Sequence, residues 1–231
     1  MLKVEAPGGA GEILLHACCA PCSGAVLECL RDSGIRPVVF FSNSNIAPRA
    51  EYELRLSELR RYTDLLGVEL VEDEYDHGAW LSAVRGLEDE PERGRRCEAC
   101  FRFRLRRAAQ YAASRGLPVL ATTLASSRWK DLDQVNAAGK DVCCGSGELP
   151  PETSSFVGPH RCASLAVPPL NVPRVAVFPE AVAAAAPLFW PQNWRKGGLQ
   201  ERRNEVIREQ GFYNQTWCGC EFSRKQNPLN Q

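Results

Sequence analysis

The chain has 231 residues, of which 44% are hydrophobic and 24% are charged, so it can bury the core of an α/β domain and is neither disordered nor fibrous. Its formal net charge is zero, with 28 basic and 28 acidic side chains, which excludes a protein that attracts polyanions with its whole surface, so any contact with nucleic acid must come from a local patch. The first residues lack the basic and apolar segments of an export signal, and no stretch approaches the ~20 apolar residues of a membrane span, so we expect a cytoplasmic protein with no membrane contact.

Strands and helices are predicted to alternate along most of the chain. Positions 52, 56, 59, 63 and 66 repeat at steps of four and three before Gly67, which is typical of an amphipathic helix that a glycine ends. The expected strands are 13–15, 37–41, 68–71 and 117–121, and the expected helices are 21–34, 48–66, 98–115 and 200–210. This alternation predicts an α/β fold, a parallel sheet with helices on both faces. In such sheets, ligands bind beyond the carboxyl ends of the strands.

Residues 141–187 differ from this pattern. They are rich in proline, contain three cysteines and show little periodicity. We expect one catalytic α/β domain over residues 1–231, with 141–187 as an insertion or lid within it.

Eleven cysteines in a chain without an export signal favour metal binding or redox chemistry over disulfides, because thiols stay reduced in the cytoplasm. Seven of them form three groups: Cys18, Cys19 and Cys22 after the first strand, Cys97 and Cys100 near a helix start, and Cys218 and Cys220 near the end. Two groups lie at predicted helix N-termini, where the helix dipole and free N–H groups stabilise thiolates, the form that binds metal. Gly219 lets the backbone turn so that both flanking sulfurs face one centre.

Four thiolates are the usual ligands of a 4Fe-4S cluster, and seven leave three for a second metal or for catalysis. A structural zinc site is the alternative, but zinc ribbons place their second pair of ligands close in sequence, whereas more than a hundred residues separate Cys100 from Cys218. The spacing therefore favours an iron-sulfur cluster at a cleft. Cys29 lies on an apolar helix face and is expected to pack in the core. Two explanations stay open for the remaining set, namely a further metal site or incidental free thiols. This set consists of Cys143, Cys144 and Cys162 with His160.

Several of these features occur together in a known family. They are Leu15-His16-Ala17-Cys18-Cys19-Ala20-Pro21-Cys22, Asn43-Ser44-Asn45-Ile46 with Glu51-Tyr52 and Arg55, Cys97-Glu98-Ala99-Cys100, Thr122-Thr123-Leu124, and Cys218-Gly219-Cys220-Glu221-Phe222-Ser223. In this order they resemble the epoxyqueuosine reductase family known as QueH, over roughly residues 12–140 and 188–224. The resemblance implies a nucleotide-hydrolase-like (HUP-like) α/β core, a 4Fe-4S cluster and a neighbouring mononuclear iron. Segment 141–187 and Trp217, where tyrosine is more usual, depart from the family pattern.

The activity that the resemblance implies is the reductive deoxygenation of epoxyqueuosine in tRNA to queuosine, the final step of queuosine biosynthesis, with an unidentified electron donor. Converting an epoxide to an alkene takes two electrons and two protons, and no ordinary side chain supplies electrons at the needed potential. Our hypothesis is that one iron binds the epoxide oxygen as a Lewis acid while the cluster feeds electrons one at a time and the oxygen leaves as water. The candidate proton donors are His16, Tyr75 and Asp76, although His16 is equally well explained as a structural histidine that bonds a backbone carbonyl.

The thiols are divided provisionally between the two metal centres. Cys97, Cys100, Cys218 and Cys220 are assigned to the cluster, and Cys18, Cys19 and Cys22 to the single iron. A crossed arrangement, with Cys18 and Cys19 at the cluster, is equally compatible with the spacing.

Substrate contact has a local signal around the Cys97 pair. Arginines gather there with Glu98 as the opposing charge, namely Arg93, Arg95, Arg96, Arg102, Arg104, Arg106 and Arg107. Such a run would hold tRNA phosphates beside the redox centre, and a solvated helix face is the alternative. Together with the family motif, it gives the candidate substrate-binding residues Asn45, Tyr52, Arg55, Arg102 and Arg106.

Two other functions stay open. An ATP-dependent tRNA-thiolation enzyme shares such a core but needs an SGGxDS-like phosphate loop after the first strand, where this chain has cysteines and Pro21 removes an amide donor. A zinc-stabilised RNA-binding module would be colourless and would contain zinc without iron.

Overall fold

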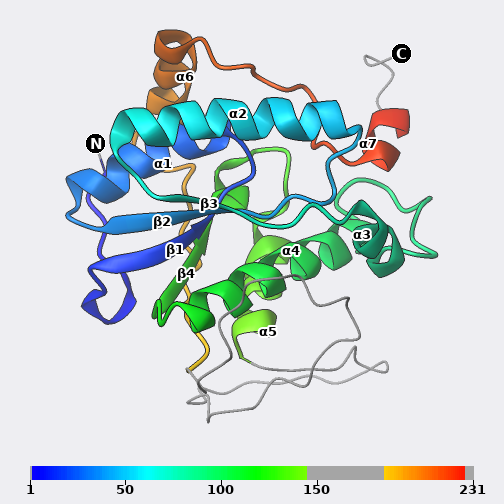
Figure 1. The fold of residues 1–231 in the computed structure, drawn as a ribbon, viewed down its shortest axis with the longest axis horizontal. Coiled ribbons are helices and arrows are strands. Elements are labelled where there is room, and N and C mark those ends of the chain that lie inside the picture. Colours follow the sequence, from blue (N-terminus) through cyan, green and yellow to red (C-terminus); the bar gives the residue numbers. More distant parts are fainter. Residues whose placement is uncertain (1, 145–184, 227–231) are drawn as a thin grey trace.

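The structure is a computed structural model and describes residues 2–144 and 185–226. Its centre is a five-stranded sheet in the order β3-β2-β1-β4-β5, in which every neighbouring pair is parallel (Figure 1). The strands are β1 (Glu12–His16), β2 (Arg36–Phe41), β3 (Leu70–Glu72), β4 (Val119–Thr122) and β5 (Leu188–Phe189). The predicted α/β fold with a parallel sheet is therefore confirmed.

Helices cover both faces of this sheet. They are α1 (Ala20–Asp32), α2 (Arg49–Leu66), α3 (His77–Ala83), α4 (Arg95–Ser114), α5 (Leu132–Cys143), α6 (Leu199–Gln210) and α7 (Glu221–Gln226), with short 3-10 helices η1 (Pro7–Gly9) and η2 (Thr123–Ser126). In Figure 1, α1, α2 and α6 lie on one side of the sheet, and α4 and α5 lie on the other. Within the described ranges, no helix combines the length and the apolar character that crossing a membrane requires.

The central strand β1 contributes side chains to both layers. Ile13 and Leu15 pack in the cluster that includes Leu56 of α2, whereas Leu14 packs in the cluster that includes Leu105 of α4. All three β1 side chains are fully buried. A strand covered on both faces reads as a continuous apolar run, which is why this strand could be recognised from sequence.

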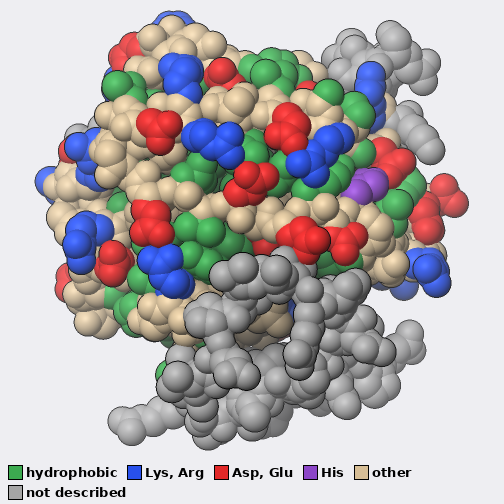
Figure 2. Space-filling model, in the orientation of Figure 1, with side chains coloured by type: hydrophobic (Ala, Val, Ile, Leu, Met, Phe, Trp, Pro, Cys, Tyr) green, Lys and Arg blue, Asp and Glu red, His purple; other side chains and the backbone are tan. Residues whose placement is uncertain are grey.

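Three strands end level with one another at the edge where a ligand site was expected. The register pairs His16 of β1 with Phe40 of β2 and with Thr122 of β4. The loop after β1 carries Cys18 and Cys19, and η2 follows β4 directly. Figure 2 shows basic and acidic side chains interspersed on one face of the molecule, in keeping with the zero net charge.

Short elements and some boundaries differ from the prediction. β3 and β4 begin two residues later than expected, and α3, β5 and α7 are too short to show a period in the sequence. The helix α5 was missed, although Asp131 caps it by accepting hydrogen bonds from the N–H groups of Asp133 and Gln134. Residues 141–143 of the expected insertion belong to α5, and most of the rest, with His160 and Cys162, lies outside the described residues.

Candidate functional site

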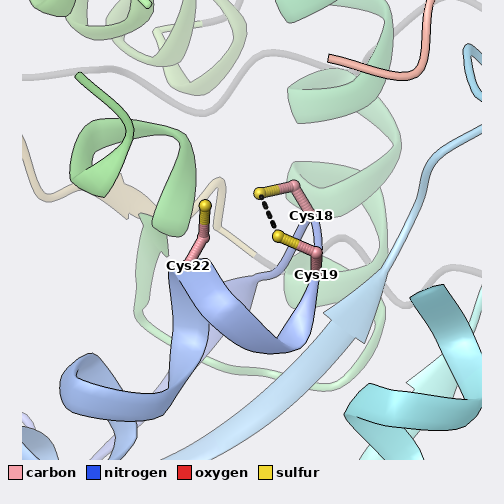
Figure 3. Close-up of side chains that lie close together, drawn as sticks. All are labelled: Cys18, Cys19 and Cys22. Atoms are coloured by element: carbon pink, nitrogen blue, oxygen red, sulfur yellow. Dashed lines mark hydrogen bonds between the residues drawn. The ribbon is translucent and has the colours of Figure 1, made fainter. Parts of the chain in front are cut away.

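Three thiols meet where β1 passes into α1 (Figure 3). The ligand atoms of Cys18, Cys19 and Cys22 all lie within 4.8 Å of one another, and the sulfurs of Cys18 and Cys19 are 3.7 Å apart. A tetrahedral metal with sulfur ligands at ~2.3 Å separates those sulfurs by about 3.7 Å. Pro21 lies in the first turn of α1, where its missing N–H has no helical partner to lose. All three thiols are buried, and their spacing is one that could hold a metal ion.

The other four cysteines of the three groups line a second, smaller cavity. Cys97 and Cys100 come from the first two turns of α4, and Cys218 and Cys220 come from the segment between α6 and α7. This cavity opens beside a larger one of about 500 Å³, whose lining includes Cys18, Cys22, Cys97 and Cys218. The structure therefore brings members of all three thiol groups to one place at the carboxyl edge of the sheet.

The N-terminal thiol group favours the anionic form of one of its sulfurs, that of Cys18. The pKa of Cys18 lies well below its usual value because hydrogen bonds from Cys19 and Cys22 stabilise its anion, and because Arg104 and Lys130 add positive charge. The backbone N–H of Cys18 is fixed by a bond to Thr123 Oγ1 at 3.2 Å. This arrangement suits a cation with thiolate ligands.

The C-terminal pair likewise favours the anionic form of one sulfur, that of Cys218. The pKa of Cys218 is also well below its usual value, because of a hydrogen bond from Cys220 and the positive charge of Lys130. Ser223 Oγ lies 3.1 Å from the sulfur of Cys218. Lys130 lines both cavities, and its ammonium faces thiols of separate groups. Lys130 was not predicted from the sequence, although its place beyond the predicted strand 117–121 was a usable signal.

Buried polar atoms beside the four cysteines lack hydrogen-bond partners among the described residues. They are Nε1 of Trp80, Nε and Nη2 of Arg96, and Oδ1 of Asn45, and all three residues line the smaller cavity. Leaving a buried donor such as Nε1 of Trp80 or Nη2 of Arg96 unsatisfied costs about 1–3 kcal/mol, so an acceptor is expected beside these two residues. Thiolates and inorganic sulfide are acceptors, so these donors are compatible with a sulfur-containing group bound beside the four cysteines.

The loop of Cys218 is held by α2. Arg55 Nη1 donates to the carbonyl of Cys218 at 3.1 Å and Nη2 donates to the carbonyl of Trp217 at 3.3 Å. Glu51 fixes the guanidinium through a bond of 2.6 Å. Arg55 lines the larger cavity, so this candidate substrate residue also positions a thiol.

The candidate proton donor His16 is fully buried beneath the thiol turn. Its Nδ1 lies 2.9 Å from Thr122 Oγ1, and its Nε2 lies 3.2 Å from the carbonyl oxygen of Ser42. Burial, with the charge of Arg104, lowers the pKa of His16 to about 3, so the ring is neutral. The carbonyl must then accept from Nε2, and these contacts favour the structural explanation of His16.

The other two candidate donors lie outside both cavities. Tyr75 donates its hydroxyl to the carbonyl of Ile46 at 2.8 Å, and Asp76 caps α3 by accepting from the N–H of Ala79 at 2.8 Å. Neither is in the lining of the thiol cavities. Their catalytic role stays a prediction.

Only two of the five candidate substrate residues line the thiol cavities. Asn45 and Arg55 line the cavities, whereas Tyr52 is buried with its hydroxyl 3.2 Å from Glu72, and Arg102 pairs with Asp141 at 3.0 Å. Arg106 lines neither cavity.

Most arginines of the run around α4 bind or pack within the protein itself. Arg96 and Arg104 are buried, and Arg107 forms an ion pair with the buried Asp73. These arginines therefore do not form the continuous exposed surface that a phosphate-binding run needs.

Cysteines outside the three groups also have defined places. Cys29 is fully buried and donates to the carbonyl of Leu2 at 3.2 Å, in keeping with the expected packing role. Cys143 is buried in the core beside α4, and Cys144 is exposed.

Comparison with known proteins gives a consistent result. The sequence profile of the family described as "Epoxyqueuosine reductase QueH" matches residues 13–157 and 162–226. Proteins named epoxyqueuosine reductase QueH from Histophilus somni and Haemophilus influenzae are 38% and 36% identical over 221 residues, which is 96% of this chain and 75% of each relative. The protein of that name from Acinetobacter baylyi is 35% identical over 222 residues, which is 96% of this chain and 84% of the relative.

Proposed function

The chain belongs to the epoxyqueuosine reductase QueH family, whose members are oxidoreductases of queuosine biosynthesis, and we propose that it deoxygenates epoxyqueuosine in tRNA with an iron-sulfur cluster and an adjacent iron. The observation that carries this proposal is the meeting of three distant thiol groups at the larger cavity. Cys97, Cys100, Cys218 and Cys220 would hold the cluster, because they line one small cavity beside unsatisfied N–H donors. Cys18, Cys19 and Cys22 would hold the single iron, because three clustered thiols leave a coordination position open.

The reaction needs a supply of electrons and protons. One epoxide, two electrons and two protons give one alkene and one water, so both C–O bonds of the ring are broken. The bound iron centres would pass on electrons that an external reductant provides. They would also supply a Lewis acid. The cavity of about 500 Å³ has room for a nucleobase with its substituent, and Lys130 offers positive charge beside the thiols, where the leaving oxygen gains negative charge.

Two alternatives are less well supported. The turn after β1 turns three sulfurs toward one another, which differs from the amide-rich phosphate loop that an ATP-dependent thiolation enzyme needs. Membership of a reductase family also argues against a non-catalytic zinc module.

The test is an anaerobic assay with purified protein, a chemical reductant and tRNA carrying epoxyqueuosine. Nucleosides from the digested tRNA are separated and weighed by mass spectrometry. The proposal expects loss of one oxygen atom from epoxyqueuosine, and iron and sulfide in the active protein. Active protein that contains zinc and no iron would refute the cofactor assignment.

A Trp80→Phe variant is expected to lower the midpoint potential of the bound cluster by roughly tens of millivolts. The reason is that the variant loses one hydrogen bond to a cluster sulfur, and such bonds stabilise the reduced cluster. Trp80 is fully buried, and its Nε1 has no acceptor among the described residues. The measurement is a spectroscopic redox titration. The matched control is Trp194→Phe, because Trp194 is equally buried with an unsatisfied Nε1 but lines neither cavity. Equal potentials in the two variants would contradict the assignment.

A Gly219→Ala variant is expected to bind several-fold less iron. Gly219 has a φ of +100°, and a Cβ there would lie 2.8 Å from Cγ1 of Ile46 and 3.1 Å from Nη1 of Arg55. The strain, on the order of 1–3 kcal/mol, would displace Cys218. Iron analysis measures the effect. Gly116→Ala is the control, because Gly116 also has a positive φ but faces open space, and its iron content should match that of the wild type.

A further inference from the structure

An exposed tryptophan lies at the mouth of the larger thiol cavity. Of the large hydrophobic side chains exposed in the described part of the chain, only Trp129, with 62% of its surface exposed, lines this cavity. The others lie elsewhere, at Leu54, Leu65, Leu81, Leu188 and Tyr213. An exposed indole at the entrance of this cavity offers a ligand a flat aromatic face beside a polar N–H group.

The backbone beneath this indole is held from two sides. Arg93 donates from Nε to the carbonyl of Trp129 at 3.1 Å and from Nη2 to the carbonyl of Arg128 at 3.4 Å. Nη2 of Arg195 donates to the carbonyl of Ser127 at 2.6 Å and to the carbonyl of Lys130 at 2.7 Å. Because these bonds use only backbone carbonyls, the side chains of Arg128 and Trp129 stay in solvent. These four bonds restrain the loop backbone, and a restrained loop loses less conformational entropy when a ligand binds.

The charge at this mouth suits an anion. The guanidinium of Arg128 lies 5.4 Å from the ring centroid of Trp129, and Arg93, Lys130 and Arg203 line the same cavity. Glu92 is the single carboxylate residue among the described lining residues. The chain as a whole is neutral, so this excess of positive charge is local.

We propose that Trp129, together with Arg128, is a stacking platform for an unpaired base of the tRNA, next to the nucleotide whose base enters the thiol cavity. The base stacks on the indole, and its phosphates lie near Arg128 and Arg203. Single-stranded RNA is bound in this way, by aromatic rings that take the bases and basic side chains that take the backbone. The proposal rests on the proposed function, because it takes tRNA as the ligand. In this proposal the tRNA phosphates contact the basic side chains at the cavity mouth. The arginines of α4 are not needed for that contact, because most of them bind partners within the protein.

The test is the affinity of the full chain, purified anaerobically with its metals, for an unmodified tRNA transcript, measured by fluorescence anisotropy. Trp129→Ala is expected to weaken binding by about 5- to 150-fold, the range for loss of one stacked base. Trp129→Phe should recover most of the affinity, which a merely structural role of the indole would not predict for so exposed a residue. The matched control is Leu65→Ala, because Leu65 is 64% exposed on α2 and does not line the cavity; its affinity should equal that of the wild type.

The platform would be overturned by a wild-type chain that does not bind the transcript, or by a Trp129→Ala variant that binds as tightly as the wild type. These outcomes are separate from failure of the proposed function, because the transcript carries no epoxide. A chain that binds through Trp129 and does not deoxygenate epoxyqueuosine keeps the platform and loses the function. A chain that deoxygenates tRNA with unchanged affinity in Trp129→Ala keeps the function and loses the platform.

Discussion

A Cys218→Ser variant is expected to lose the iron-sulfur cluster and to reduce the turnover of epoxyqueuosine by more than about 100-fold, since loss of an outer-shell partner alone costs a metal site 10–100-fold. Cys218 lines both cavities, and the hydrogen bond from Cys220 and the charge of Lys130 hold its pKa well below the usual value. A serine hydroxyl does not ionise near neutral pH, so the variant lacks the anionic ligand and the negative charge that faces Lys130. Iron and sulfide analysis and the absorption spectrum of anaerobically purified protein measure the loss directly.

The control for this experiment is Cys29→Ser. Cys29 is fully buried on α1, about 10 Å further along the helix axis than Cys22, and lines neither cavity. A serine there keeps a donor for the carbonyl of Leu2. Iron, sulfide and turnover of Cys29→Ser should equal those of the wild type. Wild-type metal content in Cys218→Ser would contradict the place given to Cys218.

Features that depend on local sequence could be predicted. The buried strand β1 shows as an apolar run, and the end of α2 at Gly67 shows as a glycine, which adopts the left-handed conformation with φ of 64°. Two cysteine groups were correctly expected at helix N-termini, since Cys19 occupies the position just before α1 and Cys97 lies in the first turn of α4. These properties are set by side-chain periodicity and backbone preference within a few residues.

Features that depend on long-range packing could not be predicted. The arginines of α4 look like a phosphate-binding run in the sequence, but Arg104 turns inward to bond the carbonyl of Ser42 after β2. Trp80 reaches the thiols from the short helix α3, and Lys130 reaches them from the loop between η2 and α5, and neither segment carries a motif. These residues come together only when the strands pair, because the pairing brings the ends of β1, β2 and β4 to one level.

A Cys18→Ser variant is expected to keep the cluster, lose one iron per chain and lose turnover by more than about 100-fold, because it removes one of three ligands of the single iron while leaving the smaller cavity intact. Cys18 is the informative choice, since its pKa is the lowered one of the three clustered thiols. The wild type should contain about five irons and four sulfides, four irons and the sulfides in the cluster and one iron beside it. Chemical analysis of iron and sulfide in the same sample gives both counts.

The ratio of the two counts then decides how the seven thiols are divided. In the proposed division, Cys18→Ser lowers iron by about one and leaves sulfide unchanged, whereas Cys218→Ser removes sulfide. In the crossed arrangement, Cys18 is a cluster ligand, so Cys18→Ser removes sulfide as well. The proposed division has a physical reason. Three clustered thiols would hold one iron without filling a four-ligand shell, and Cys18 and Cys22 line the larger cavity, where the epoxide would enter. Loss of sulfide in Cys18→Ser would therefore refute the division while leaving the family and its reaction untouched.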